Sequence, residues 1–311
     1  MLPVCEPPAK PISTSRPKSR FRAPDIVLFD DTVRANIRLG RPEASDAEVE
    51  EAGRAALVDE FAQKLPRGWD TQVGAVLDQL KAEGLLENTA IFIFGDNGRC
   101  LIRGKQWLYD PGTHVPLLVR WPGRVKAGAV RKDPVISLDI TATSLEIAGI
   151  AKPALFHGQG LFSGAKPRKQ IFTARDRCDM TVERIRAVRD SRYKLIRNFM
   201  PERPYTQFNE YITANYPTQA VIKELAGTGK LTPVQTNWLA PRKPEIELYD
   251  HQADPFEVNN LAGDKKHQAT VKRLSRDLDR WIAETNDQGR TPESREAFER
   301  EEPRWNVTPK G

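Results

Sequence analysis

Apolar positions between residues 74 and 148 predict alternating helices and strands. The runs 90–94 and 117–121 predict two strands, and the first is typical of a strand buried on both faces of an α/β sheet. A helix is predicted to end at Gly84. Its apolar face consists of Val76, Leu77 and Leu80. Residues 138–148 predict a further helix.

The C-terminal half of the chain has a different, α+β pattern. Period-2 alternation in residues 184–189 and 192–197, on both sides of a short polar link, predicts a β-hairpin. Residues 245–249 predict another strand. An amphipathic helix is indicated by apolar residues at spacings of three, four and three: Val271, Leu274, Leu278 and Trp281. From about Glu284 the chain is highly charged, and we expect it to be loosely held.

Local composition divides the chain into four predicted segments. Residues 1–22 are rich in proline and basic residues, which is typical of a disordered tail. A short apolar run at 26–29 predicts a strand, and Ser45 with Glu48 forms a capping box at the start of a helix. The predicted segments are 1–22, 23–74, 75–165 and 166–311.

The overall composition narrows the classes of function. Hydrophobic residues make up 39% and charged residues 29% of the 311 residues, which is typical of a globular protein. The net charge is +6, but residues 1–22 hold five basic residues against Glu6, so +4 of it belongs to the tail and we expect no nucleic-acid partner. No apolar run has the length of a membrane helix or the form of a signal-peptide core, so we expect no membrane attachment and a cytoplasmic location.

Six segments in order resemble the C-terminal half of the sulfatase family. They include GDNG (95–98), RGKQWLYD (103–110) and LYDHQADP (248–255), and the second is most similar to the heparan-N-sulfatase-like branch. The resemblance implies an α/β fold: an incomplete alkaline-phosphatase-like sandwich with a smaller α+β C-terminal domain. It also implies hydrolysis of sulfuric esters or sulfamates, with sulfated glycans or aryl sulfates as substrates. Members of the family are usually exported or lysosomal.

The same resemblance implies roles for the loop after the first strand. Asp96 and Asn97 match calcium ligands of the family, and Lys105 matches the lysine that contacts the substrate's sulfate. The chemistry is consistent, because hard oxygen donors suit Ca²⁺ and an ammonium group can neutralise a developing oxyanion. Ca²⁺ takes roughly six to eight oxygens, so the remaining ligands are expected from elsewhere in the family's structure. An isolated Asp-Asn-Gly would otherwise indicate only a turn.

Three other residues are candidate substrate contacts. His114 precedes a Val-Pro pair, where the family often has a basic residue, but a packed or solvent-facing histidine explains it equally well. Arg175 and Arg177 lie in the mixed-charge run ARDRCD after a predicted strand. In this branch of the family such residues line the substrate pocket, whereas mixed charge is also typical of a solvated surface.

The catalytic nucleophile of the family is not found in the sequence. Sulfatases use a formylglycine made from Cys or Ser in a C/S-x-P-x-R motif. Cys5 and Ser15 begin near matches, but Ala9 and Ser19 stand where the arginine belongs. We therefore expect a truncated and inactive sulfatase, or alternatively a non-catalytic remnant that binds sulfated glycans or a partner chain.

Residues 25–74 resemble a different family, the nucleotide-binding domain of ABC transporters. The stretch corresponds to the region between the Q-loop and the signature motif. The Gly-rich loop whose N–H groups cradle ATP phosphates is missing, so we expect no ATP binding, and an ATPase is the weakest alternative. Both families use a Val-Gly at the join, here Val73-Gly74, which suggests a chimeric chain with a crossover near residue 74.

Overall fold

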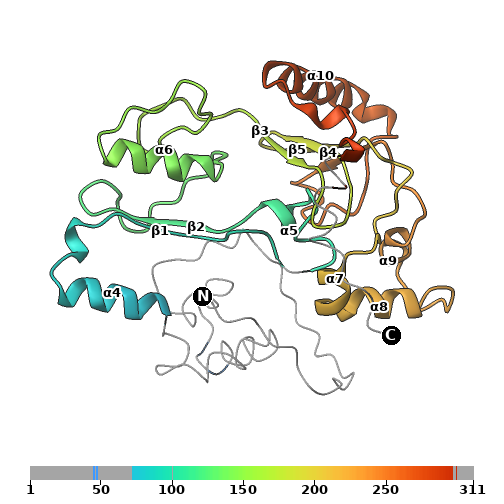
Figure 1. The fold of residues 1–311 in the computed structure, drawn as a ribbon, viewed down its shortest axis with the longest axis horizontal. Coiled ribbons are helices and arrows are strands. Elements are labelled where there is room, and N and C mark those ends of the chain that lie inside the picture. Colours follow the sequence, from blue (N-terminus) through green and yellow to red (C-terminus); the bar gives the residue numbers. More distant parts are fainter. Residues whose placement is uncertain (1–44, 46, 48–71, 100, 297–298, 300–311) are drawn as a thin grey trace. The chain divides into compact units, whose positions relative to one another are not determined.

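The computed structural model describes residues 45, 47, 72–99, 101–296 and 299 (Figure 1). The predicted tail, the strand at 26–29 and nearly all of the helix that begins at Ser45 lie outside the described residues. Most of the segment that resembles an ABC transporter lies outside them as well. The fold is therefore described from the helix that begins at residue 72.

Contacts divide the described residues into two compact units, and each is described by itself. The first unit runs to Asp96 and includes Val115–Arg131. The second unit comprises Asn97–His114 and the chain from Lys132 onward. These divisions differ from the predicted segment boundaries at residues 74 and 165, which stay predictions.

In the first unit a helix leads into a two-stranded antiparallel sheet. Its elements are α4 (Gln72–Ala82), η2 (Leu86–Asn88), β1 (Ile91–Phe94) and β2 (Leu117–Arg120). Helix α4 ends in a Schellman turn, because the Leu85 N–H donates to the Leu80 carbonyl at 2.8 Å and the Gly84 N–H to the Lys81 carbonyl at 3.1 Å. Gly84 has a φ of +70°, which glycine adopts without steric cost, and the predicted helix end is confirmed.

The expected burial of β1 on both faces is wrong. Three of its residues are half-buried, and Phe94 is 49% exposed. Among the described residues of this unit only β2 pairs with β1, so the strand lacks the neighbours and covering layers of a central strand. Val76 on α4 is also exposed, although its spacing placed it on the predicted apolar face.

The second unit is organised around a four-stranded antiparallel sheet (Figure 1). Its strands are β3 (Ile171–Arg175), β4 (Ile185–Arg189), β5 (Tyr193–Asn198) and β6 (Ile246–Asp250), in that order across the sheet. The predicted hairpin is confirmed, since β4 and β5 are joined by a turn in which the Asp190 carboxylate accepts the backbone N–H groups of Arg192 and Tyr193 at 2.8 and 2.7 Å. The sheet confirms the expected α+β pattern.

Helices and 3₁₀ turns precede, separate and follow the strands of this sheet along the chain. They are α5 (Asp110–Thr113), α6 (Leu138–Ile147), α7 (Glu210–Asn215), α8 (Pro217–Glu224), α9 (Pro233–Trp238), η3 (Lys265–His267), α10 (Gln268–Glu284) and η4 (Gln288–Arg290). The predicted helices at 138–148 and 271–281 are both confirmed. Within the described part of the chain, none of the helices has the length and apolar character that crossing a bilayer requires.

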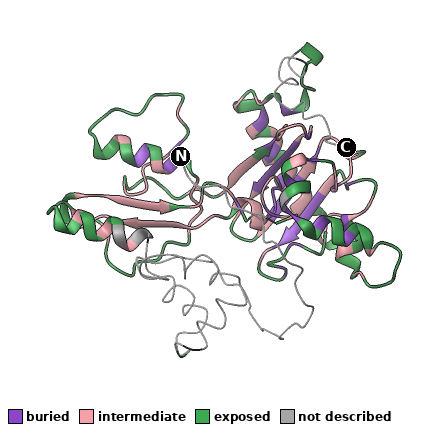
Figure 2. Ribbon diagram, turned by 60° about the horizontal axis from the view of Figure 1, so that its bottom comes forward, coloured by how far each residue is buried: buried purple, intermediate pink, exposed green. Residues whose placement is uncertain are grey.

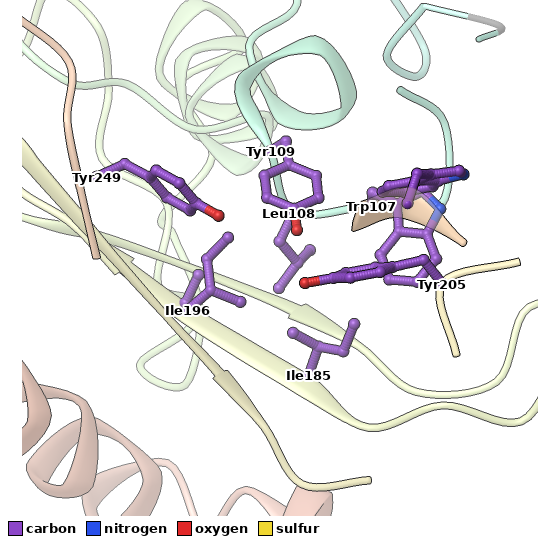
Figure 3. Close-up of a cluster of buried hydrophobic side chains, with 9 residues drawn as sticks. Trp107, Leu108, Tyr109, Ile185, Ile196, Tyr205 and Tyr249 are labelled. Carbon is purple, nitrogen blue, oxygen red and sulfur yellow. The ribbon is translucent and has the colours of Figure 1, made fainter. Parts of the chain in front are cut away.

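Period-2 alternation places two separate cores on the faces of the sheet. Figure 2 shows that buried residues are concentrated in the strands of this sheet. On one face, Val188, Leu195 and Leu248 pack against Leu274 and Leu278 of α10, and all of them are fully buried. The other face carries an aromatic cluster over strands β4, β5 and β6 (Figure 3). That cluster consists of Trp107, Leu108, Tyr109, Ile185, Ala187, Ile196, Tyr205, Trp238 and Tyr249.

The expectation of a loosely held chain after Glu284 is wrong as far as residue 293. Asp287 accepts from Nε of Arg186, which is 2% exposed, at 2.9 Å. The guanidinium of Arg290 pairs with Asp279 on α10. Charged residues in this segment are thus partners for cations of the sheet and helix, a role that their composition alone could not indicate.

Candidate functional site

The RGKQWLYD run is anchored by its aromatic half. Tyr109 lies in the aromatic cluster (Figure 3). Its hydroxyl donates to Glu247 at 2.7 Å. Three other groups donate to the same carboxylate: the hydroxyls of Tyr249 (2.6 Å) and Tyr205 (3.2 Å) and the Asn198 amide (2.8 Å). Burial, together with the Glu247 charge, raises the pKa of all three tyrosines, so they remain neutral donors.

This anchor holds the other half of the run in a tight turn. Gly104 is required there, because a Cβ atom at this position would lie 2.0 Å from the Arg99 carbonyl oxygen. The Lys105 N–H donates to that oxygen at 2.8 Å. Gln106 follows with a φ of +80°, which is strained for a long side chain. The turn therefore fixes the positions from which Lys105 and Gln106 project.

Lys105 is half-buried and lies over an aromatic ring. Its ammonium nitrogen is 5.0 Å from the centre of the Tyr211 ring. Among the described residues it forms no ion pair with a carboxylate. Its positive charge and that of Arg175 both act on the Cys178 thiol, whose pKa is raised mainly by burial. Two of the predicted site residues, Lys105 and Arg175, are thus both near enough to Cys178 for their charges to lower the pKa of its thiol.

The two arginines of the ARDRCD run have different surroundings. Arg175 ends β3 and is 7% exposed, with its guanidinium 4.7 Å from the centre of the Trp107 ring. Within the described ranges, its Nε and Nη1 have no hydrogen-bond partner. Arg177 instead pairs with Glu293, with Nε and the carboxylate oxygen 3.0 Å apart. Arg175 is therefore the stronger candidate for binding an anion.

His114 lies beside a buried ion-pair network that the sequence did not reveal. Its Nδ1 is 3.5 Å from Asp110, and its side chain is 44% exposed. Asp110 also pairs with Arg189 and Lys194, each at 2.6 Å, and Lys194 lies 2.7 Å from the fully buried Glu257. These partners are far apart in the sequence, so no spacing could have indicated the network.

The network also contains a group that resembles a metal site. Side-chain donor atoms of Asp110, His251 and Glu257 all lie within 4.8 Å of one another. However, the Lys194 ammonium already contacts both carboxylates, and Arg189 adds a second cation. The charge that a metal would supply is therefore present in the side chains, and we assign no metal to this group.

His251 predicts a pH dependence of stability. Burial lowers the pKa of His251 from 6.5 to about 4, so the folded protein holds it neutral while the unfolded chain protonates it below about pH 6.5. The unfolded state binds more protons in that range, and we expect stability to fall by up to about 3 kcal/mol as the pH decreases from 6.5 to 4.

Urea unfolding of wild type and His251→Gln across this pH range measures the effect. Glu257, whose pKa burial raises, contributes an opposite slope in both proteins, so the difference between them isolates the histidine. Parallel pH profiles for the two proteins would contradict the assignment.

Asp96 and Asn97 lie in a bend directly after β1. Asp96 is exposed and Asn97 is half-buried. A carboxylate and an amide oxygen are donors that suit Ca²⁺, but two side chains supply only part of the six to eight oxygens it takes. The two side chains are of the type that binds Ca²⁺, but they are too few to complete its coordination shell. Their placement around one ion stays a prediction.

Two family models match the chain. The model described as Sulfatase matches residues 42–150, and the model described as N-sulphoglucosamine sulphohydrolase, C-terminal, matches residues 101–211. The chain is 39% identical over 231 residues to an ulvan-active sulfatase of Formosa agariphila and 29% identical over 250 residues to human N-sulphoglucosamine sulphohydrolase. The matches cover 72% and 75% of this chain, but only 38% and 49% of the two relatives.

A solved structure described as a 2-O GAG sulfatase is similar in fold. The likeness has a TM-score of 0.55 at 20% identity and covers 91% of this chain and 56% of that one. It shows the α/β, alkaline-phosphatase-like fold that the sequence predicted.

The resemblance to ABC transporters has weaker support. A stretch of 50 residues is 54% identical to a multidrug export ATP-binding/permease protein of Staphylococcus aureus, and another match of 50 residues is 56% identical to heavy metal tolerance factor 1 of Caenorhabditis elegans. The sulfatase match begins at residue 42, inside the predicted segment 23–74, so the junction near residue 74 stays a prediction. Through residues 42–211, this chain belongs to the sulfatase family.

Proposed function

We propose that the chain contributes sulfate recognition to the hydrolysis of sulfuric esters or sulfamates of sulfated glycans. Two relatives support the substrate class by their names, one acting on ulvan and the other on N-sulphoglucosamine. The observation that carries the proposal is the geometry of Lys105. An anchored turn holds its ammonium over Tyr211, with no carboxylate pair among the described residues, so its charge is available to an oxyanion.

Hydrolysis in this family requires groups beyond those described for this chain. A bound Ca²⁺, held in part by Asp96 and Asn97, would supply positive charge next to the transferred sulfate. Lys105 would bind and orient a sulfate oxygen. The nucleophile is the remaining requirement, and the sequence contains no C/S-x-P-x-R motif from which formylglycine is made. We therefore propose that the 311-residue chain alone binds sulfated glycans without hydrolysing them.

The full chain is expected to show no sulfatase turnover above background. Covalent catalysis does not proceed without its nucleophile. The measurement uses an aryl sulfate and N-sulfoglucosamine as substrates with added calcium. A Cys5→Ala, Ser15→Ala variant serves as the control for the two near matches. Calcium-dependent turnover that persists in this variant would contradict the proposal that the chain lacks a nucleophile.

Retention on heparin distinguishes the binding function from an inert remnant. We expect the chain to be retained, and Lys105→Met to elute at lower salt, because one charge contact is lost. Lys272→Met is the matched control, since Lys272 is exposed on α10. Equal elution of Lys105→Met and Lys272→Met would mean that Lys105 does not recognise sulfate.

A further inference from the structure

A small pocket lies next to the turn that carries Lys105. Its walls include Gln106, Trp107, Arg175, Thr181 and Asn209. The water-accessible volume is about 20 Å³, enough for one or two waters or for the oxygens of one small anionic group. A sugar ring does not fit inside it. The pocket therefore suits the tip of a ligand and not the whole of it.

Two side chains that line this pocket carry buried donors that no described residue satisfies. Arg175 is more than nine-tenths buried, and its Nε and Nη1 have no hydrogen-bond partner in the part of the chain that the structure describes. The Nε2 of Gln106 is also buried and has no partner among the described residues, and the backbone of Gln106 is strained at φ +80°. Buried polar groups are nearly always hydrogen-bonded, and strained residues are concentrated at functional sites. Both observations indicate a site suited to a ligand that carries hydrogen-bond acceptors.

The charge around Arg175 is also uncompensated. The carboxylate that most favours its charged form is Glu183, which already pairs with Lys243 at 2.7 Å. Glu183 also accepts from the Gln207 amide at 2.8 Å. Asp179, a carboxylate next to Cys178 in sequence, accepts from the Asn209 amide at 3.3 Å. Burial of a guanidinium without its own counter-ion costs free energy, which an anionic ligand would offset.

We infer that this pocket is a second anion subsite, in which Arg175 and Gln106 bind one oxyanion group of the substrate while Lys105 contacts another. The choice of a glycan as ligand rests on the proposed function. Sulfate and carboxylate groups, which acidic glycans can carry, both present oxygens that accept from a guanidinium. The guanidinium carbon of Arg175 lies 4.7 Å from the centre of the Trp107 ring, and this cation–π contact does not occupy its N–H groups, which can donate to the ligand.

Ligand-induced thermal shifts of the full chain test this subsite. The probes are inorganic sulfate, N-sulfoglucosamine and glucuronate, each compared with chloride at the same ionic strength. A ligand that binds the native state raises the melting temperature, and we expect a rise with at least one sugar probe in wild type. A rise with N-sulfoglucosamine alone assigns a sulfate group, and a rise with glucuronate alone assigns a carboxylate.

Arg175→Met is the decisive variant, because methionine keeps the packing on Trp107 and removes the donors. We expect it to lose the rise while its own melting temperature stays equal to or above that of wild type, since no paired charge is broken. Arg186→Met is the contrast: Arg186 is equally buried but pairs with Asp176 and Asp287, so its loss lowers the melting temperature. Arg273→Met, which removes a more exposed arginine, keeps the ligand-induced rise.

A second variant, Gln106→Gly, removes the amide and relieves the backbone strain. We expect higher stability with a smaller ligand-induced rise. Equal rises in wild type and Arg175→Met, or no rise with any probe in wild type, would overturn the subsite. Weaker heparin retention of Lys105→Met together with unchanged behaviour of Arg175→Met would retain the proposed function and overturn only this inference.

Discussion

Replacing Lys194 by methionine is expected to lower the free energy of unfolding by about 3–5 kcal/mol. Lys194 is 2% exposed and lies between two carboxylates, at 2.6 Å from Asp110 and 2.7 Å from Glu257. Methionine fills a similar volume but carries no charge, so the fully buried Glu257 loses its closest cation. The loss arises mainly from an uncompensated buried carboxylate. Urea unfolding at neutral pH measures it.

Two further variants identify the cause. Adding Glu257→Gln to Lys194→Met removes the uncompensated charge and should restore part of the lost stability. Arg295→Met removes an exposed pair with Glu299 and should change stability little. If Glu257→Gln lowers the stability of the Lys194→Met variant as much as it lowers the stability of wild type, the two residues do not form one coupled pair.

The second large effect is expected at Lys105 in a complemented enzyme. A sulfatase N-terminal half that carries the C/S-x-P-x-R motif would replace residues 1–74, and turnover should appear with added calcium. Lys105→Ala should then reduce kcat about a hundredfold or more, the scale on which one transition-state charge contact acts. Lys105→Arg should recover part of the rate, because it keeps a positive charge at the turn. Steady-state rates on an aryl sulfate measure both variants.

Asp96→Ala should behave differently in the same complemented enzyme. A metal ligand affects calcium affinity first, so its activity should recover in part at high calcium, whereas that of Lys105→Ala should not. Lys272→Ala provides a surface-lysine control. A complemented enzyme that works equally well without the Lys105 ammonium would show that this turn does not recognise sulfate.

Much of the local structure was predictable from the sequence, because its signals have short periods. The Schellman end of α4 at Gly84, the hairpin around Asp190 and the helix α10 each follow from neighbours within a turn or a strand. The RGKQWLYD run was also recognisable as part of a sulfatase-like site. Its roles as anchor and turn were not, because they depend on Glu247 and Arg99 meeting it in space.

Two pairs of residues show where local pattern could not decide. Phe94 and Val76 are apolar in an apolar pattern and yet exposed, because burial depends on which layers cover a strand or helix. Arg175 and Arg177 are two residues apart in one charged run, and both were equal candidates before their neighbours in space were known. Only the structure distinguishes them, because Arg177 pairs with Glu293, whereas Glu183, the carboxylate beside Arg175, pairs with Lys243.

By itself, the sequence determined the family, the order and type of most described elements, and the candidate residues Asp96, Asn97 and Lys105. These depend on residue type and spacing within short stretches. The tertiary structure alone decided which charges are compensated. The Lys194 network joins residues 84 positions apart, and the Tyr109–Glu247 contact joins residues 138 positions apart. Charge compensation is a property of distances in space, so Arg175 could be identified as unpaired among the described residues only from the positions of the carboxylates that the structure describes.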